Sequence, residues 1–307
     1  MNYQEFLNYV KDHVTDEMVG YEEAEVLVNE VLKNNDTSFS GLCIKLQDEK
    51  MAPNLYLNPY YEKYQMGHSL EQIIHQIREQ YLEALKNQPI FEVDFTHFEN
   101  VKDNLILRLV NYKMNKKALK ESPYLRYHDL AITFRFMTYQ DEIGISTVLL
   151  QNSKVETWGK GKEELYEMAL QNTKRLFPEQ IQSMKEVMEV EGFETVNKKE
   201  PLTPFCVIKE EPLTPLYVLS NECGINGATA LLYPDTLKEF AEKQDCNLFI
   251  LPSSIHEVIL VPENEYVENT DLYDIVKEAN ETVVEEMEVL SDNVYYYDRQ
   301  KDAIKMI

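Results

Sequence analysis

The stretch LYVLSNECGINGATALLYPDTLKEFAEKQDCNLFILPSSIHEVILVP, residues 216–262, decides the fold class of this chain. Apolar runs bounded by glycine or proline predict strands, and the spacing of Leu237, Phe240 and Ala241 predicts a helix with an inward apolar face. The predicted order is strand, glycine turn, short strand, helix, strand, turn and strand. This mixture favours an α+β fold with mixed or antiparallel sheets and packed helices.

The length of 307 residues allows two or three such units. We expect an N-terminal α+β unit, a middle α+β unit, a proline-containing linker and a C-terminal α+β unit, over residues 1–90, 91–195, 196–215 and 216–307. The linker is predicted because it holds four prolines, which favour extended chain.

Apolar periodicity predicts the elements of the first two units and of the C-terminal end. Helices are expected at 2–14, 70–88, 153–158, 162–177, 179–190 and 271–283, strands at 24–32, 41–46, 52–57, 105–110, 130–139, 143–150 and 294–297, and fraying at 301–307. Ser69 with Gln72, and Ser153 with Glu156, have the spacing of a capping box. Asn172 falls within an apolar helical stripe, so we expect it to be buried and hydrogen-bonded.

The composition excludes several classes of protein. The net charge is −24, which repels nucleic acid and anionic membranes, so direct nucleic-acid binding is not expected. The four cysteines have neither CxxC nor zinc-finger spacing, and we interpret them as reduced thiols of a cytoplasmic protein. There is no run of 18 apolar residues, and the N-terminal residues are expected to form an amphipathic helix instead of a signal peptide; we also expect no membrane association, metal or cofactor.

The only tight cluster of potentially reactive side chains is Ser253, Ser254, His256 and Glu257. A serine nucleophile needs a base within hydrogen-bond reach and a third group that orients the base. The chain has neither a GxSxG elbow nor a recognisable oxyanion loop. We therefore favour a turn in which the serines bond local backbone and His256 caps a strand end. A hydrolase that uses Ser254 and His256 is the alternative.

One basic stretch interrupts the acidic chain, KMNKKALKESPYLR at residues 113–126. Its cations are Lys113, Lys116, Lys117, Lys120 and Arg126. They form a possible interaction surface for an acidic partner or for nucleic acid. The other interpretation is a solvated helix whose charges pair with nearby carboxylates, and we favour it.

Several segments resemble a bacterial family of unknown function, DUF5688. They are NLYLNPYYEKYQMGHSLEQI, LILRLVNYKMNKKAL, YHDLAITFRF, ELYEMALQNTKRLFP, GATALLYPDTLKEFAEK, LPSSIHEVILVP and VLSDNVYYYD, and together they extend over nearly the whole chain. The resemblance implies a cytosolic protein of gut-dwelling Gram-positive anaerobes. It implies no activity, cofactor or catalytic residue.

These observations favour a non-enzymatic protein-binding or regulatory module. The absence of a catalytic or metal motif from a sequence with good core periodicity supports this hypothesis. Two alternatives remain. One is the hydrolase built on Ser254 and His256, and the other is an acidic mimic that occupies a protein that handles nucleic acid.

Overall fold

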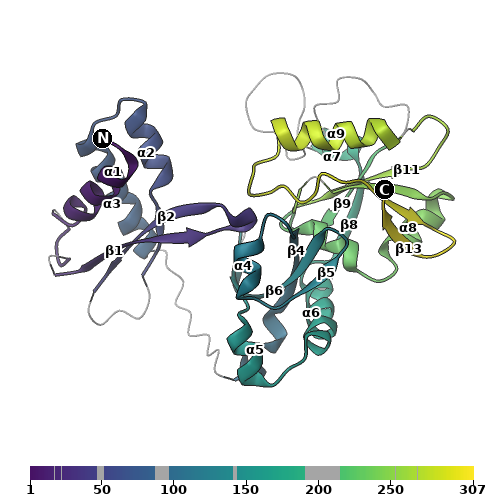
Figure 1. Cartoon of the computed structure of the whole chain (residues 1–307), viewed down its shortest axis with the longest axis horizontal. Coiled ribbons are helices and arrows are strands. Elements are labelled where there is room, and N and C mark those ends of the chain that lie inside the picture. Colours follow the sequence, from purple (N-terminus) through teal and green to yellow (C-terminus); the bar gives the residue numbers. More distant parts are fainter. Residues whose placement is uncertain are drawn as a thin grey trace. The chain divides into compact units, whose positions relative to one another are not determined.

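The computed structural model describes residues 1–16, 18–21, 23–46, 52–86, 97–140, 144–190, 215–252, 254–267 and 269–307. Helices and three antiparallel sheets confirm the predicted α+β class (Figure 1). The chain divides into two compact units, Met1–Lys33 with Thr37–Phe91, and Asn34–Asp36 with Glu92–Ile307. The division into units 1–90, 91–195 and 216–307 predicts which parts of the chain can fold independently. That division stays a prediction. Residues 196–214 of the predicted linker lie outside the described residues.

The first unit packs three helices against a three-stranded sheet. The elements are α1 (Tyr3–His13), β1 (Glu25–Leu32), β2 (Ser38–Lys45), β3 (Leu55–Tyr56), α2 (Asn58–Gln65) and α3 (Leu70–Lys86), with sheet order β1-β2-β3. The predicted capping box is confirmed, because Gln72 N–H donates to Ser69 Oγ and Ser69 N–H donates to Gln72 Oε1, both at 3.2 Å. Buried Tyr81 of α3 donates to the carbonyl of Ile44 and accepts its N–H, each at 2.8 Å. This hydroxyl provides hydrogen-bond partners for the backbone N–H and carbonyl of Ile44, which lies beyond the residues of β2 that pair with short β3.

The second unit contains two sheets. The four-stranded sheet holds β4 (Leu105–Asn111), β5 (Tyr124–Tyr127), β6 (Leu130–Gln140) and β7 (Ile145–Leu149), in the order β4-β6-β5 with β7 also paired to β6. The six-stranded sheet has the order β13-β12-β10-β11-β9-β8. Its strands are β8 (Glu179–Ser183), β9 (Tyr217–Asn221), β10 (Leu248–Leu251), β11 (Val258–Pro262), β12 (Tyr295–Asp298) and β13 (Ala303–Met306).

Helices cover these sheets and share their cores. They are α4 (Lys116–Lys120), α5 (Asn152–Trp158), α6 (Lys162–Leu176), α7 (Met184–Val190), α8 (Thr236–Gln244), α9 (Asn269–Thr282) and the 3₁₀ helices η1 (Asn34–Asp36), η2 (Phe98–Asn100), η3 (Lys102–Asn104) and η5 (Gly227–Leu232). One core joins Phe134 of β6 and Ala169 of α6 to Leu260 of β11. A second core places α7 and α9 against the other face of the six-stranded sheet (Figure 1).

Side chains protect the edge strand β4. The backbone N–H of Leu107 donates to Thr173 Oγ1 at 2.9 Å, and that of Leu109 donates to Thr229 Oγ1 at 3.3 Å. Asn172 Nδ2 donates to the carbonyl of Leu105 at 3.0 Å, which confirms that this buried amide is hydrogen-bonded. An edge capped in this way offers no free ladder to another strand.

The predicted helix over 179–190 is wrong in its first half, because residues 179–183 form β8 and pair with β9. Proline 178 removes a backbone N–H, and the pairing with residues 217–221 determines the extended conformation. A capping box then opens α7, with Ser183 Oγ accepting from Glu186 N–H at 3.2 Å. Helix α7 therefore begins at Met184.

Three smaller predictions are also wrong. The short strand expected near residues 228–232 is η5, whose small residues pack into the core. Helix α5 begins at Asn152 and has no side-chain cap, so the Ser153–Glu156 box does not form. Residues 303–306, expected to be frayed, pair with β12 as β13.

Candidate functional site

The predicted reactive segment lies in the loop between β10 and β11. Ser254 is buried, and its Oγ accepts the backbone N–H of His256 at 3.0 Å. Glu257 is also buried, directly before β11. Ser253 lies outside the described residues. The hydroxyl oxygen of Ser254 therefore accepts a hydrogen bond from the backbone of its own loop, as is common for serine in turns.

Both ring nitrogens of His256 have hydrogen-bond partners. The backbone N–H of Asn226 donates to Nδ1 at 3.3 Å, so the proton of a neutral ring lies on Nε2. Nε2 lies 3.2 Å from Glu288 Oε1 and donates to it. This hydrogen bond holds the pKa of Glu288 below its usual value, although partial burial opposes the shift. A base for a serine nucleophile needs a ring nitrogen facing the hydroxyl, and among the described contacts neither nitrogen faces Ser254.

A close packing of two loops positions His256. Ser220 Oγ donates to the carbonyl of His256 at 2.8 Å, and the backbone N–H of Ala228 donates to the carbonyl of Ile255 at 3.2 Å. A Cβ on Gly227 would lie 2.5 Å from that same His256 oxygen, so only glycine fits there. Asn226 has φ 55°, the left-handed conformation that starts this tight approach. Gly227 of NECGINGA therefore serves loop packing, whereas Gly224 adopts a left-handed turn conformation with φ 66° and has no close neighbour at the position of a Cβ.

Arg108 of β4 and Arg135 of β6 are residues that our sequence analysis missed. Both side chains are half-buried, and the desolvation of their guanidinium groups lowers the pKa of Arg108 to about 9 and that of Arg135 to about 10. Arg135 Nε donates to Thr147 Oγ1 at 2.8 Å. Arg108 Nε has no hydrogen-bond acceptor among the described residues. A charged residue inside the apolar runs LILRLV and TFRFM was the available signal.

The two arginines line a small cavity near His256. Its volume is about 10 Å³, and its wall includes Thr147, Ile225 and Asn226. Asn226 connects the cavity to His256 through the backbone hydrogen bond. The sequence-predicted histidine and the unpredicted arginines thus belong to one region of the second unit, which we call the arginine cavity region.

The basic stretch forms an exposed surface around α4. We call its five cations, all exposed, the α4 basic surface: Lys113, Lys116, Lys117, Lys120 and Arg126. None of them makes an ion pair with a carboxylate in the described parts of the chain. The carboxylate of Asp36 instead accepts the backbone N–H of Lys117 at 2.8 Å. Arg126 lies over the ring of Tyr112, 3.5 Å from its centroid.

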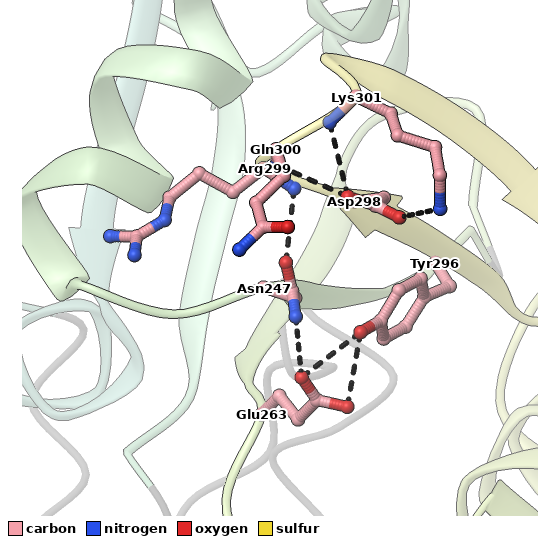
Figure 2. Close-up of polar contacts among 7 residues, drawn as sticks. All are labelled: Asn247, Glu263, Tyr296, Asp298, Arg299, Gln300 and Lys301. Carbon is pink, nitrogen blue, oxygen red and sulfur yellow. Dashed lines mark hydrogen bonds and ion pairs between the residues drawn. The ribbon is translucent and has the colours of Figure 1, made fainter.

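A third polar group of residues closes the turn between β12 and β13 (Figure 2). Glu263 accepts from Asn247 Nδ2 at 2.7 Å and from the hydroxyl of Tyr296 at 3.0 and 3.1 Å. Asp298 accepts the backbone N–H groups of Gln300 and Lys301, each at 3.1 Å. We call these residues the β12–β13 turn cluster. Asp298 has local partners, which is the pattern of a structural turn, whereas Glu263 connects residues from distant parts of the sequence.

Searches for a metal centre and a membrane span identify no candidate within the described residues. No group of three or more His, Cys, Asp or Glu side chains there could hold a metal ion. No helix there is long and apolar enough to cross a membrane. Cys223 and Cys246 are free thiols, and Cys206 lies outside the described residues.

Comparison with known families settles the relationship of the chain. A model of a family of unknown function, DUF5688, matches residues 3–299. The chain belongs to this family. No curated protein and no solved structure shows significant similarity to it. Membership in DUF5688 confirms the family resemblance and assigns no activity.

Proposed function

We propose that this DUF5688 protein is a non-enzymatic binding module whose α4 basic surface contacts an acidic segment of a partner protein. One observation carries the proposal: five exposed cations without carboxylate partners among the described residues lie together in a chain of net charge −24. Exposed charges that are not paired within the molecule attract an opposite charge from outside. A cytoplasmic, bacterial setting is part of the same proposal.

The surface is held by a rigid base. Leu119 of α4 packs with Val110 and Ala131, and the rings of Tyr112 and Tyr124 pack against this group. The Asp36 carboxylate fixes the first turn of α4 through the N–H groups of residues 117 and 118. A fixed helix presents its cations at low cost in conformational entropy on binding.

A protein partner fits this surface better than nucleic acid does. The chain outside the surface is strongly acidic, and a long phosphate backbone would meet that charge. A short acidic segment of a protein can contact the five cations alone, because charges beyond about 10 Å are screened at ordinary salt.

The experiment compares tagged full-length protein with a charge-reversed variant in extracts of its host cells. We expect the triple variant Lys116→Glu, Lys117→Glu and Lys120→Glu to lose a stoichiometric partner, by at least about tenfold in recovered amount. The matched control reverses three exposed lysines elsewhere, Lys243, Lys277 and Lys305, and should keep the partner.

Salt and nuclease complete the design. The complex should weaken between about 50 and 500 mM salt, because exposed charges carry it. Equal recovery with the triple variant and with wild type would refute the proposal. If nucleic acid is recovered and all partners are lost after nuclease treatment, the ligand of the α4 basic surface is nucleic acid and not an acidic protein segment.

A further inference from the structure

Arg108 and Arg135 lie on the same face of the four-stranded sheet. Ile106 of β4 is opposite Arg135 of β6, and Arg108 is opposite Thr133. Residues two apart on a strand point to the same face, so Arg108 and Arg135 are diagonal neighbours. The Cα atoms of such diagonal neighbours are about 7–8 Å apart. Both side chains line one cavity, and the charge of Arg135 acts on Arg108, so the remaining contacts must stabilise two like charges.

The described residues do not balance this positive charge. Both arginines stay protonated at neutral pH, since their lowered pKa values of about 9 and 10 are still above 7. Glu288 is the carboxylate whose charge acts on Arg108. His256 Nδ1 accepts a hydrogen bond from Asn226, and this ring supplies no negative charge. The contacts that act on this pair thus set one carboxylate, Glu288, against two guanidinium groups, and positive charge is in excess beside the cavity.

Buried charge without a partner is costly, and hydrogen-bond donors without acceptors add to the cost. Arg135 Nε donates a hydrogen bond to Thr147 Oγ1, whereas Arg108 Nε has no acceptor among the described residues. Ile106, Ile145 and Phe177 also line the cavity, and their apolar surface strengthens any electrostatic attraction inside it. An anion in the cavity would satisfy the charge and the donor together.

The size of the cavity limits what can enter. Its volume of about 10 Å³ is close to the space that one water molecule needs. A complete phosphate or carboxylate group is larger. A monatomic anion, or one terminal oxygen of a larger anion, matches this space. Guanidinium suits either, because it is weakly hydrated and offers several donors in a fixed plane.

We propose that the cavity between Arg108 and Arg135 binds one anionic atom, either a chloride ion or one terminal oxygen of a carboxylate or phosphate. A water molecule would satisfy the donor and leave the charge in place. The site is separate from the α4 basic surface, so its test is independent of the proposed partner binding.

The test uses full-length protein transferred into buffer that contains only methanesulfonate as anion. Chloride, acetate or phosphate is then added at constant ionic strength while the unfolding temperature is recorded. We expect at least one of the three to raise the unfolding temperature of wild type along a saturable curve. A rise with chloride identifies a monatomic site, and a rise with acetate or phosphate alone identifies an oxygen site.

Variants decide whether the arginines are responsible. Arg108→Met removes the charge at similar length, and we expect it to lose the saturable rise while its unfolding temperature in methanesulfonate equals or exceeds that of wild type. Arg108→Lys keeps the charge without the planar group and should bind at least about tenfold more weakly. The matched control, Arg175→Met, removes an exposed arginine of α6 and should respond as wild type does.

Two results would overturn the proposal. One is a wild type that shows no saturable rise with any of the three anions. The other is an Arg108→Met variant whose rise equals that of wild type. If Arg108→Met fails to fold by circular dichroism, Arg135→Met replaces it in the same comparison. Broadening of the ³⁵Cl NMR signal by wild type, and its absence with the variant, provides a direct second measurement of chloride binding.

Discussion

Two carboxylates of the second unit accept hydrogen bonds from side chains in different surroundings. Asp129 accepts from Ser291 Oγ at 2.7 Å, from Asn293 Nδ2 at 2.9 Å and from the hydroxyl of Tyr295. Glu263, in the β12–β13 turn cluster, accepts from two donors, Asn247 Nδ2 and the hydroxyl of Tyr296, whose single proton is within reach of both carboxylate oxygens (Figure 2). Ser291 and Tyr295 are fully buried, whereas the contacts of Glu263 are exposed.

The difference teaches that the burial of the donors is the better guide to the importance of such hydrogen bonds. Water can replace the Glu263 carboxylate as hydrogen-bond acceptor, because the groups that donate to it already face solvent. Water cannot easily reach the hydroxyls of Ser291 and Tyr295, so the loss of Asp129 leaves these two buried groups unsatisfied. The same reasoning separates the buried loops around His256 and Asp129 from the exposed turn, and the predictions below test this separation.

The largest expected effect is steric and lies in the buried loops. Gly227→Ala should reduce the free energy of unfolding by about 3 kcal/mol or more. Its Cβ would lie 2.1 Å from Ser220 Oγ and 2.5 Å from the carbonyl oxygen of His256. The control is Gly144→Ala, which has nothing within 4 Å of the new Cβ. Urea unfolding followed by circular dichroism measures both, and equal stabilities would contradict the close packing of the loops.

The next effect compares the two carboxylates directly. Asp129→Ala should cost about 2–3 kcal/mol, because the hydroxyls of Ser291 and Tyr295 lose their acceptor in a buried place. Glu263→Ala should cost about 0.5 kcal/mol or less. Urea unfolding again gives the values. A cost for Glu263→Ala as large as that for Asp129→Ala would show that burial does not govern the difference.

These buried contacts explain which parts of the structure the sequence could predict. Helix α3 and its Ser69–Gln72 cap depend on residues a few positions apart, and local periodicity is sufficient for them. Strand β8 depends on residues 217–221, and no local pattern contains that pairing. The reactive segment was found from its residue types, but its partner Glu288 comes from 32 positions further on.

The arginine cavity region was missed for a related reason. Arg108 and Arg135 become neighbours only through the register of β4 and β6. A single charged residue in an apolar strand suggests a protected position, but it does not show which second charge lies beside it. The register of β4 and β6 is set in the folded sheet. The sequence alone therefore does not indicate that two arginines 27 positions apart belong to one site.

A smaller, pH-dependent effect is expected at Glu288. Its hydrogen bond with His256 lowers the pKa in the folded state, so the carboxylate stabilises the fold above its unfolded pKa of about 4.3. This contribution is lost as the pH falls through the lower folded-state pKa. At pH 7, Glu288→Gln should be less stable than wild type by up to about 1 kcal/mol, a value limited by the partial exposure of the group.

The pH series gives this prediction its check. Urea unfolding at several values between pH 7 and pH 3 should show the difference between wild type and Glu288→Gln shrinking below about pH 4.3. Glu285→Gln is the matched control for the loss of one negative charge, since Glu285 is exposed and nearby. A constant difference for Glu288→Gln would mean that the hydrogen bond with His256 does not shift its pKa.

The smallest effect lies within the exposed β12–β13 turn cluster. Lys301→Ala removes an ion pair with Asp298 from a side chain that is 77% exposed, and it should change the free energy of unfolding by less than about 0.5 kcal/mol. Asp298→Ala should cost about 1 kcal/mol, because the carboxylate also accepts two backbone N–H groups of the turn. The two variants share one ion pair and differ in the backbone contacts. Equal costs in urea unfolding would therefore assign the turn's stability to the ion pair, and a larger cost for Asp298→Ala would assign it to the backbone hydrogen bonds.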